Sequence, residues 1–365
     1  MINLQFFPSR RIALYMARLF VVRSFAVLVA LVLVLMTLDL LGNSGEILAH
    51  PGNGDAELWR YVSLRVPQLV ARFLPFSVLL GTLITLVALN QHSEIVTMKA
   101  AGISAHQIIA PLVLAGLAVA AANFLFNERF VTRANAAYSA WEAVEYGPLP
   151  AASNVQADVR VQHGEDLIFV DQIAGHGESL RLRGVTIYDR SGGTMRRILR
   201  ADSGRRTAGG WELRDATLFT VATGQLARME RVELGPALRP EQFTLAGVDP
   251  DGQSFWRLRR SIEALRAAGR PTATLEASFW HKIAGPLSTV LMPLLAAVAA
   301  FGLARSGQLF VRAVIGMALG FAYFVADNFA LAMGNFGAYP PFLAAWGPFL
   351  LFLLVGEAVL IRTEE

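Results

Sequence analysis

Six long apolar stretches dominate the pattern of hydrophobic and polar positions along the chain. Each has about 20 or more residues, which is the length an α-helix needs to cross a hydrocarbon core of about 30 Å. They lie at about residues 14–41, 66–89, 103–126, 279–303, 311–333 and 342–361. We therefore predict six transmembrane helices, three on either side of a long polar segment.

The segment between the third and fourth stretches has a different period. Apolar residues recur at every second position, as in Leu180 and Leu182 and again in Trp211 and Leu213, with glycine-rich breaks between the runs. This alternation is typical of antiparallel strands that form a sandwich or roll. Its last part, 254–268, has apolar residues at helical spacing and predicts an amphipathic helix that Asp251 or Ser254 can cap.

The predicted fold is an α-helical membrane protein with six transmembrane helices in a 3+3 arrangement and an inserted β-jelly-roll-like domain. We place the boundaries at 1–128, 129–275 and 276–365. Composition agrees, because 54% of the 365 residues are apolar and only 16% are charged, whereas soluble chains are about 25% charged. A single soluble domain and a disordered chain are both excluded.

Basic residues in the short loops predict the orientation, because arginine and lysine gather on the cytoplasmic side of a membrane. The loops that we assign to the cytoplasm contain Arg10, Arg11, Arg18, Lys99, Arg305, Arg312 and Arg362. The loops on the other side contain Arg60 and Arg65, both beside the second stretch. Both termini are predicted to be cytoplasmic and the β domain to lie outside.

Several kinds of site are not indicated. The chain has no cysteine, and its lysines, Lys99 and Lys282, both lie outside any Gly-x-x-x-x-Gly-Lys-Ser/Thr motif, so it cannot bind nucleotide as a P-loop ATPase does. The six histidines lack the spacing of a metal site. The pI is near 9.7, but without a basic run we predict no nucleic-acid partner. We predict no catalytic residue and no metal.

Residues 93–102 connect the second and third stretches on the predicted cytoplasmic side. Ser93 is a suitable N-cap, Glu94 places a carboxylate in the first helical turn, and Gly102 can close the C-terminus. The pattern predicts a short helix. Spacing alone leaves open whether this helix is a capped connector or a contact for a soluble partner.

Several motifs together resemble one known family. They are Leu79-Leu80-Gly81, the run from Ser93 to Gly102, the run from Lys282 to Ser288, and Gly320-Phe321 with Asp327. They resemble the LptF/LptG permease family, also called YjgP/YjgQ, of the lipopolysaccharide exporter, and the similarity covers essentially the whole chain. The run from Leu38 to Leu41 and the opening of the fourth stretch look more like the LptG branch.

The resemblance implies a non-catalytic permease subunit of an ABC-type exporter in the inner membrane of a Gram-negative cell. Such a subunit extracts lipopolysaccharide from the outer leaflet and passes it to a periplasmic bridge, which a periplasmic β-jelly roll continues. The implied partners are an LptF-like paralogue, an LptB-like ATPase dimer that binds ATP and Mg, an LptC-like bitopic protein and a periplasmic bridge protein. No cofactor is implied in this chain.

The same resemblance assigns roles to individual residues. Glu94 occupies the position of the acid in the family's coupling helix, so we predict that it contacts the ATPase. The residues predicted to complete that contact are Ser93, Met98, Lys99 and Gly102. The first and fifth stretches line the family's lateral gate, where Gly316 and Gly320 would let another helix approach closely or would simply pack.

Charged residues near the outer half of the membrane are the remaining candidates. Asp327 lies inside the fifth stretch, where a charge costs about 2.5–3.5 kcal/mol, and either faces a wet cavity or packs beside Asn328. Arg72 and Arg133 either bind a lipid phosphate through paired hydrogen bonds or extend to the interface. Asp39 lies close to the outer interface.

One departure from the family concerns the first stretch. Its outer half often carries lysines in LptG members, and here the matching region has Met36, Gly42 and Asn43. A phosphate would then be bound by other cations, such as Arg60 or Arg133, or the lipid is less phosphorylated.

Two alternatives belong to other functional classes. An intramembrane enzyme would use Asp39 and Asp327 as a carboxylate pair on a lipid-linked substrate and would need no nucleotide. A membrane scaffold would only bind partners through its external domain, and lipid would not stimulate an associated ATPase.

Overall fold

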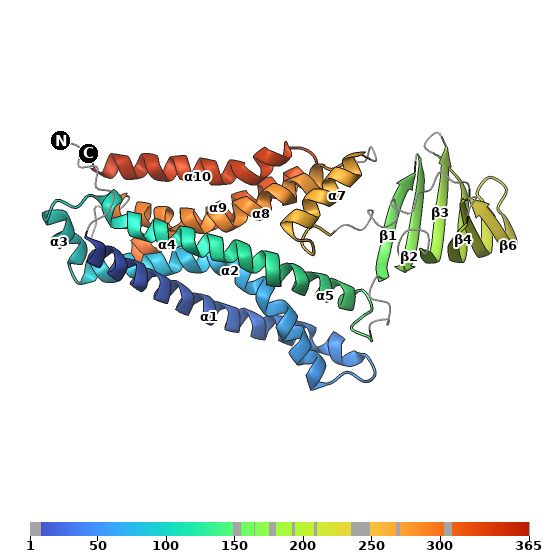
Figure 1. The fold of residues 1–365 in the computed structure, drawn as a ribbon, viewed down its shortest axis with the longest axis horizontal. Coiled ribbons are helices and arrows are strands. Elements are labelled where there is room, and N and C mark those ends of the chain that lie inside the picture. Colours follow the sequence, from blue (N-terminus) through green and yellow to red (C-terminus); the bar gives the residue numbers. More distant parts are fainter. Residues whose placement is uncertain are drawn as a thin grey trace. The chain divides into compact units, whose positions relative to one another are not determined.

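The computed structural model describes residues 9–148, 155–163, 165–174, 180–191, 194–207, 210–234, 249–267, 271–302 and 309–364. The chain divides into two compact units, which are described separately (Figure 1). One unit consists of Met1–Ala136 together with Pro250–Glu365, and the other of Ala137–Asp249.

Six helices among the described residues are long and apolar enough to cross a membrane, which confirms the predicted number. They are α1 (Arg10–Ala49), α2 (Asp55–Gln91), α4 (Ala105–Phe126), α8 (Ala273–Ala297), α9 (Leu309–Asn335) and α10 (Pro341–Glu364). The short helix α3 (Glu94–Ala100) lies between α2 and α4. After α8, the π-helical turn η3 (Val298–Gly302) precedes the residues that are not described.

Two helices extend well beyond the apolar stretches that predicted them. Helix α2 begins at Asp55 rather than near residue 66, and its start is capped by the Glu57 carboxylate, which accepts the Gly54 N–H at 2.8 Å. Helix α4 continues through the π-helical turn η1 (Asn127–Val131) into α5 (Thr132–Glu142). Hydropathy marks only the part of a helix that suits lipid, so it misses polar turns that continue the same hydrogen-bond ladder.

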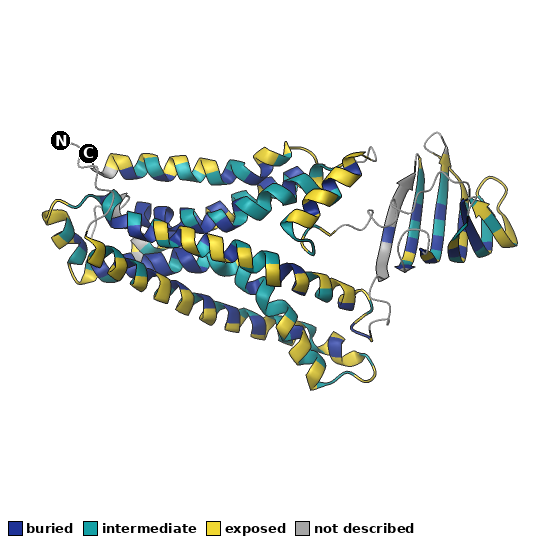
Figure 2. Ribbon diagram, viewed as in Figure 1, coloured by how far each residue is buried: buried dark blue, intermediate teal, exposed yellow. Residues whose placement is uncertain are grey.

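Helix α8 lies at the centre of the helical unit and packs against α2, α4, α9 and α10. The core around it contains Phe20, Leu79, Leu112 and Leu291, all fully buried. Helix α1 buries a single stripe, with a buried residue at nearly every fourth position from Met16 to Met36 (Figure 2). Many of its other apolar side chains, such as Leu33 and Leu38, are exposed, as lipid or a partner helix requires.

The two ends of the helical unit differ in what they carry. Helix α3, the start of α1 and the end of α10 lie at one end, and α5 and α7 (Phe255–Ala267) lie at the other (Figure 1). The segment that leads to the inserted unit therefore leaves from the end opposite α3. This arrangement agrees with the predicted order of the spans, in which the short helix and the inserted segment follow even and odd numbers of membrane crossings, respectively.

The described strands form one six-stranded antiparallel sheet in the order β1-β2-β3-β4-β5-β6. The strands are β1 (Val155–His163), β2 (Asp166–Ala174), β3 (Arg181–Ser191), β4 (Thr194–Thr207), β5 (Gly210–Thr220) and β6 (Gln225–Leu234). Leu180, Leu182, Trp211 and Leu213 are all buried in one core, as their alternation predicts. Strands consecutive in the chain pair with each other throughout, which makes the described part of the sheet a meander.

Helix α7 matches the predicted amphipathic helix, with Leu258, Ile262 and Leu265 buried. Ser254 lies at its start, and its hydroxyl accepts the Arg257 N–H at a long 3.4 Å. The helix packs against α8 and belongs to the helical unit. The compact β unit is therefore shorter than the predicted segment 129–275, because the start of α5 and all of α7 belong to the helical unit.

Candidate functional site

Helix α3 is a short helix held by a few apolar side chains. Ile95 is buried and Met98 packs partly against the same core, whereas Val96 is 60% exposed and Lys99 is exposed. Gly102 has a φ of +83° and closes the C-terminus, with its N–H donated to the Lys99 carbonyl at 2.9 Å. The exposed surface of α3 is available to a partner.

Ser93 does not cap α3 as predicted. Its backbone is left-handed, with a φ of 56°, and its side chain makes no cap hydrogen bond. A serine caps a helix from extended backbone, where its hydroxyl points at the free N–H groups. The tight reversal after α2 removes that geometry, and Thr97 instead donates its hydroxyl to the Ser93 carbonyl at 2.9 Å.

Glu94 is tied to α1 rather than free in solvent. The Tyr15 hydroxyl donates to a Glu94 carboxylate oxygen at 3.2 Å. Two turns further along α1, the Arg23 guanidinium donates to the Ile84 carbonyl of α2 at 3.1 Å. Helices α1, α2 and α3 are thus joined by polar contacts close to the α3 end.

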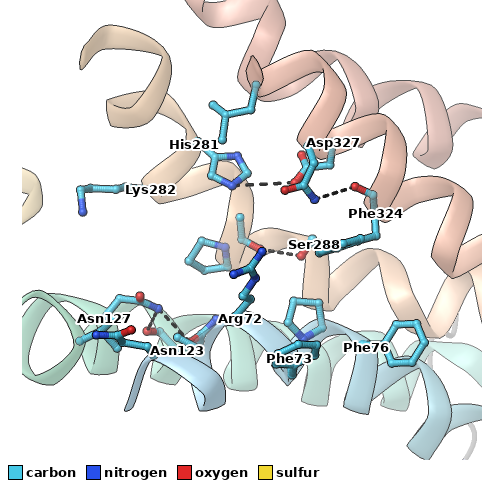
Figure 3. A pocket seen from close by; sticks show the side chains of 18 of the residues that line it. Arg72, Phe73, Phe76, Asn123, Asn127, His281, Lys282, Ser288, Phe324 and Asp327 are labelled. Atoms are coloured by element: carbon cyan, nitrogen blue, oxygen red, sulfur yellow. Dashed lines mark hydrogen bonds and ion pairs between the residues drawn. The ribbon is translucent and has the colours of Figure 1, made fainter. Parts of the chain in front are cut away.

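A cavity of about 730 Å³ lies within the helical unit, between α1, α2, α4 with η1, α8 and α9. Much of its wall is apolar, and the aromatic side chains of Phe73 and Phe76 point toward it (Figure 3). The other apolar residues that line it include Leu31, Leu35, Met292, Phe321, Phe324 and Leu331. Such a wall suits an acyl chain or another apolar ligand.

Polar groups lie along one part of the same cavity (Figure 3). Arg72 comes from α2 and Lys282 from α8, so two cations contribute to the lining. Asp327 of α9 faces His281 of α8 at 3.8 Å, which is an ion-pair distance but too long for a hydrogen bond. The Nδ1 atom of His281 is buried and has no hydrogen-bond partner within the described residues.

The π-helical turn η1 brings Glu128 to the rim of this cavity. One Glu128 carboxylate oxygen accepts the N–H of Phe255, the first residue of α7, at 2.7 Å. The anion is therefore engaged by a helix N-terminus, where the helix dipole favours negative charge. Asn127, in the same turn, donates to the Asn123 carbonyl and side-chain oxygens, both at 3.0 Å.

The predicted site residues do not all meet in the cavity. Arg72, Gly320 and Asp327 line it, whereas Asp39, Arg133 and Gly316 are not among the lining residues. Arg133 is exposed on α5. Gly316 and Gly320 both face α2, because a Cβ at either would lie within 3 Å of the Leu83 or Leu79 side chain.

Asp39 forms an ion pair and hydrogen bonds with residues of α2, which the sequence did not indicate. Arg65 binds both of its carboxylate oxygens, at 2.8 and 3.0 Å, and the Tyr61 hydroxyl donates to one of them at 2.7 Å. The Arg65 guanidinium also reaches Gln68, which lines the cavity. Asp39 therefore joins α1 to α2, while Asp327 pairs with His281, so the two carboxylates do not form the pair that an intramembrane enzyme would need.

Sequence reasoning missed Tyr15, Arg65, His281 and the roles of Glu128 and Lys282. Each is a polar residue in or beside an apolar helix, and the cost of burying such a group is a usable signal. Their partners come from other helices, so only the helix rotations reveal them. Across the described residues, no group of three His, Asp or Glu side chains is arranged to hold a metal ion.

Comparisons with known proteins agree with one another. A family model described as "Lipopolysaccharide export system permease LptF/LptG" matches residues 14–362. The lipopolysaccharide export system permease protein LptG of Escherichia coli K12 is 26% identical over 320 residues, covering 83% of this chain and 84% of the relative. The LptG protein of Haemophilus influenzae is 25% identical over 329 residues, covering 86% and 89%.

Proposed function

Because the chain belongs to the LptF/LptG family of lipopolysaccharide export permeases, we propose that its cavity receives the lipid and that α3 carries the contact with a driving ATPase. The chain is a multi-pass membrane protein and a permease subunit of a lipopolysaccharide export system. The proposals below concern the partners, the membrane orientation and the residues that act.

The proposed assembly pairs this chain with an LptF-like six-span subunit and an LptB-like ATPase dimer, which binds ATP and Mg. An LptC-like bitopic protein and a periplasmic bridge protein would accept the lipid. The chain has no phosphate-binding lysine loop of its own, which supports the proposal that a partner supplies the energy. Exposed apolar side chains on α1 and α9, such as Leu33 and Phe321, provide surfaces that a similar subunit could cover.

The observation that carries the cavity proposal is its mixed lining. Acyl chains would lie against Phe73, Phe76 and their apolar neighbours, and a phosphate would be bound by Arg72 and Lys282. An arginine can hold a phosphate through two parallel hydrogen bonds, and a lysine acts as a point charge. These two residues would supply part of the charge that the first span lacks.

The proposed mechanism begins at α3. Closure of the ATPase dimer on ATP would displace α3, and α2 and α4 would move with it because they are directly connected in the chain. The Tyr15 hydrogen bond would carry the same displacement to α1. The cavity would narrow and expel the lipid toward the periplasmic side, where the β domain would receive its acyl chains.

The experiment that tests this proposal reverses one charge. Glu94→Lys should abolish lipopolysaccharide export in membranes reconstituted with the partner ATPase, because it would reverse the charge that α3 offers to its partner. Glu46→Lys makes the same change at an exposed position near the other end of α1 and should leave export intact. Undiminished export by Glu94→Lys, with the ATPase still bound, would contradict the proposed role of α3.

A further inference from the structure

Helix α7 has two faces of opposite character. Its apolar face, formed by Leu258, Ile262 and Leu265, is buried against the helical unit. The other face carries Trp256, which is 61% exposed, together with the exposed Arg257 and Arg260. The apolar face is thus already covered by protein, and the basic face is exposed.

The arginines of α7 differ in their partners. Arg259 pairs with Glu263 at 3.0 Å, and Arg266 pairs with Glu276 of α8 at 2.8 Å. By contrast, the Arg257 guanidinium contacts no acceptor in the part of the chain that the structure describes, and Arg260 reaches only the Trp256 carbonyl at 3.5 Å. These two guanidinium groups can therefore bind an external anion without breaking an ion pair.

A belt of aromatic rings runs from the start of α7 onto α8 and α10 and indicates where these helices meet the membrane surface. Phe255 stacks on Phe279 of α8 with ring centroids 4.4 Å apart. From there, edge-on and stacked contacts continue through Trp280, Phe342 and Trp346. Tryptophans gather where a transmembrane helix enters the headgroup region, and from these rings we infer that the first turn of α7 lies at headgroup level.

We propose that Trp256, Arg257 and Arg260 form a docking surface for anionic phospholipid headgroups of the leaflet that surrounds this belt. Two cations without acidic partners beside an exposed indole match a lipid phosphate in charge and the interface in polarity. Bound lipid would hold the start of α7 in place. Because Glu128 binds the N–H of Phe255, it would also hold the rim of the cavity.

The absence of cysteine makes a direct test possible. A fluorophore attached through Ala264→Cys, an exposed position on α7, would report lipid binding when the full chain in zwitterionic detergent is titrated with phosphatidylglycerol. Arg257→Gln combined with Arg260→Gln should weaken the apparent affinity about 25-fold, since each arginine near an anionic surface contributes about a five-fold factor. Phosphatidylcholine should give little response.

Two controls separate this surface from a general effect of charge. Arg228→Gln with Arg231→Gln removes two exposed arginines from β6 and should leave the titration unchanged. Arg257→Lys with Arg260→Lys should retain most of the affinity and shows that the helix still folds. Equal affinities for the glutamine variant and the unaltered chain, or equal responses to the two lipids, would overturn the proposal. The measurement uses neither ATPase nor lipopolysaccharide, so its result is independent of the proposed export mechanism.

Discussion

A single hydroxyl group joins Glu94 of α3 to the first membrane helix. Tyr15 donates to Glu94 at 3.2 Å, which is a hydrogen bond between side chains of α1 and α3. A hydrogen bond to a charged acceptor contributes about 1.5–3 kcal/mol when it is well formed, and less when it is exposed as this one is. The bond therefore contributes little to the stability of the fold, and any role that it has lies in connecting α3 to α1.

We expect Tyr15→Phe to lower lipid export several-fold while leaving the ATPase bound and active. Removing the hydroxyl frees Glu94 from α1, so movement of α3 would reach α2 and α4 but would no longer draw α1 along. The measurement is the amount of lipid exported per ATP hydrolysed in reconstituted membranes. Tyr339→Phe, an exposed position between α9 and α10, is the matched control. An unchanged ratio would show that α1 moves without this contact.

Some polar residues whose partners lie on another helix could not be identified from the sequence. Glu94 could be selected from its place in a short helix and from the family resemblance, and Asp327 from its depth in an apolar span. Tyr15 and Arg65 could not, because each acts through a partner on another helix. The side chains that meet across two helices depend on rotations of the helices about their axes, which hydropathy does not define.

At the scale of elements, α1 and α2 approach each other closely at Gly81. A Cβ built there would lie 2.5 Å from the Ser24 Cα and 2.6 Å from its backbone nitrogen. The clash is with backbone, so a side-chain rotation cannot relieve it. Helices α1 and α2 can pack this closely only because position 81 has no side chain.

Gly81→Ala should therefore destabilise the helical unit by about 1–3 kcal/mol, which is typical of overpacking in a tight interface. The melting temperature in detergent, followed by circular dichroism, measures the loss. Gly347→Ala on α10 is the matched control, because its Cβ would meet Leu343 at an ordinary 3.5 Å. Equal melting temperatures for the two variants would show that α1 and α2 separate easily.

The elements themselves could largely be predicted, and the reasons are physical. Long apolar runs have few alternatives to a membrane helix, and alternation with glycine breaks has few alternatives to antiparallel strands. The polar extension of α2 from Asp55 and the π-helical turn η1 could not be predicted, because both are decided by packing and capping. The amphipathic helix α7 could be placed, but its assignment to the helical unit depends on tertiary contacts.

In the sheet, one acidic residue is held by two arginines. Glu212 of β5 accepts from Arg205 at 2.8 and 3.2 Å and from Arg214 at 2.9 Å. The hydrogen bonds from Arg205, and then those from Arg214, lower the pKa of Glu212 from 4.5 to about 2. Ionised Glu212 therefore stabilises the folded sheet. This contribution is complete only at a pH above 4.5, the ordinary pKa that the carboxyl has in the unfolded chain.

The sheet should lose this contribution as the pH falls from about 4.5 to about 2. Glu212→Gln removes the titrating group, so its stability should change less than that of the unaltered chain between pH 7 and pH 3. Thermal unfolding followed by tryptophan fluorescence, to which the buried Trp211 contributes, is the measurement. Glu230→Gln, an exposed acid on β6, should behave like the unaltered chain. Parallel pH dependences for all three chains would contradict the role of Glu212.

At the scale of the whole molecule, the chain consists of two compact units that differ in what they contain. The helical unit contains the cavity, α3 and α7, and the inserted unit contains the sheet. The proposed export mechanism would place α3 and the sheet on opposite sides of a membrane, because α3 would contact a cytoplasmic ATPase and the sheet would receive the outgoing lipid. Position along the helices supports this division, since α3 and the connection to the sheet lie at opposite ends of the helical unit (Figure 1).

Single cysteines in this cysteine-free chain can test the orientation directly. Ala227→Cys lies at an exposed position of β6 and Ala100→Cys at an exposed position of α3, so both thiols would be accessible to reagent. In intact spheroplasts, a membrane-impermeant maleimide should label the first and not the second, because the arginine and lysine bias of the short loops predicts a cytoplasmic α3. Permeabilised cells should label both, which shows that each thiol is reactive. Labelling of Ala100→Cys alone in intact spheroplasts would place the sheet in the cytoplasm, where it could not receive an outward-moving lipid, and the export mechanism would have to be abandoned.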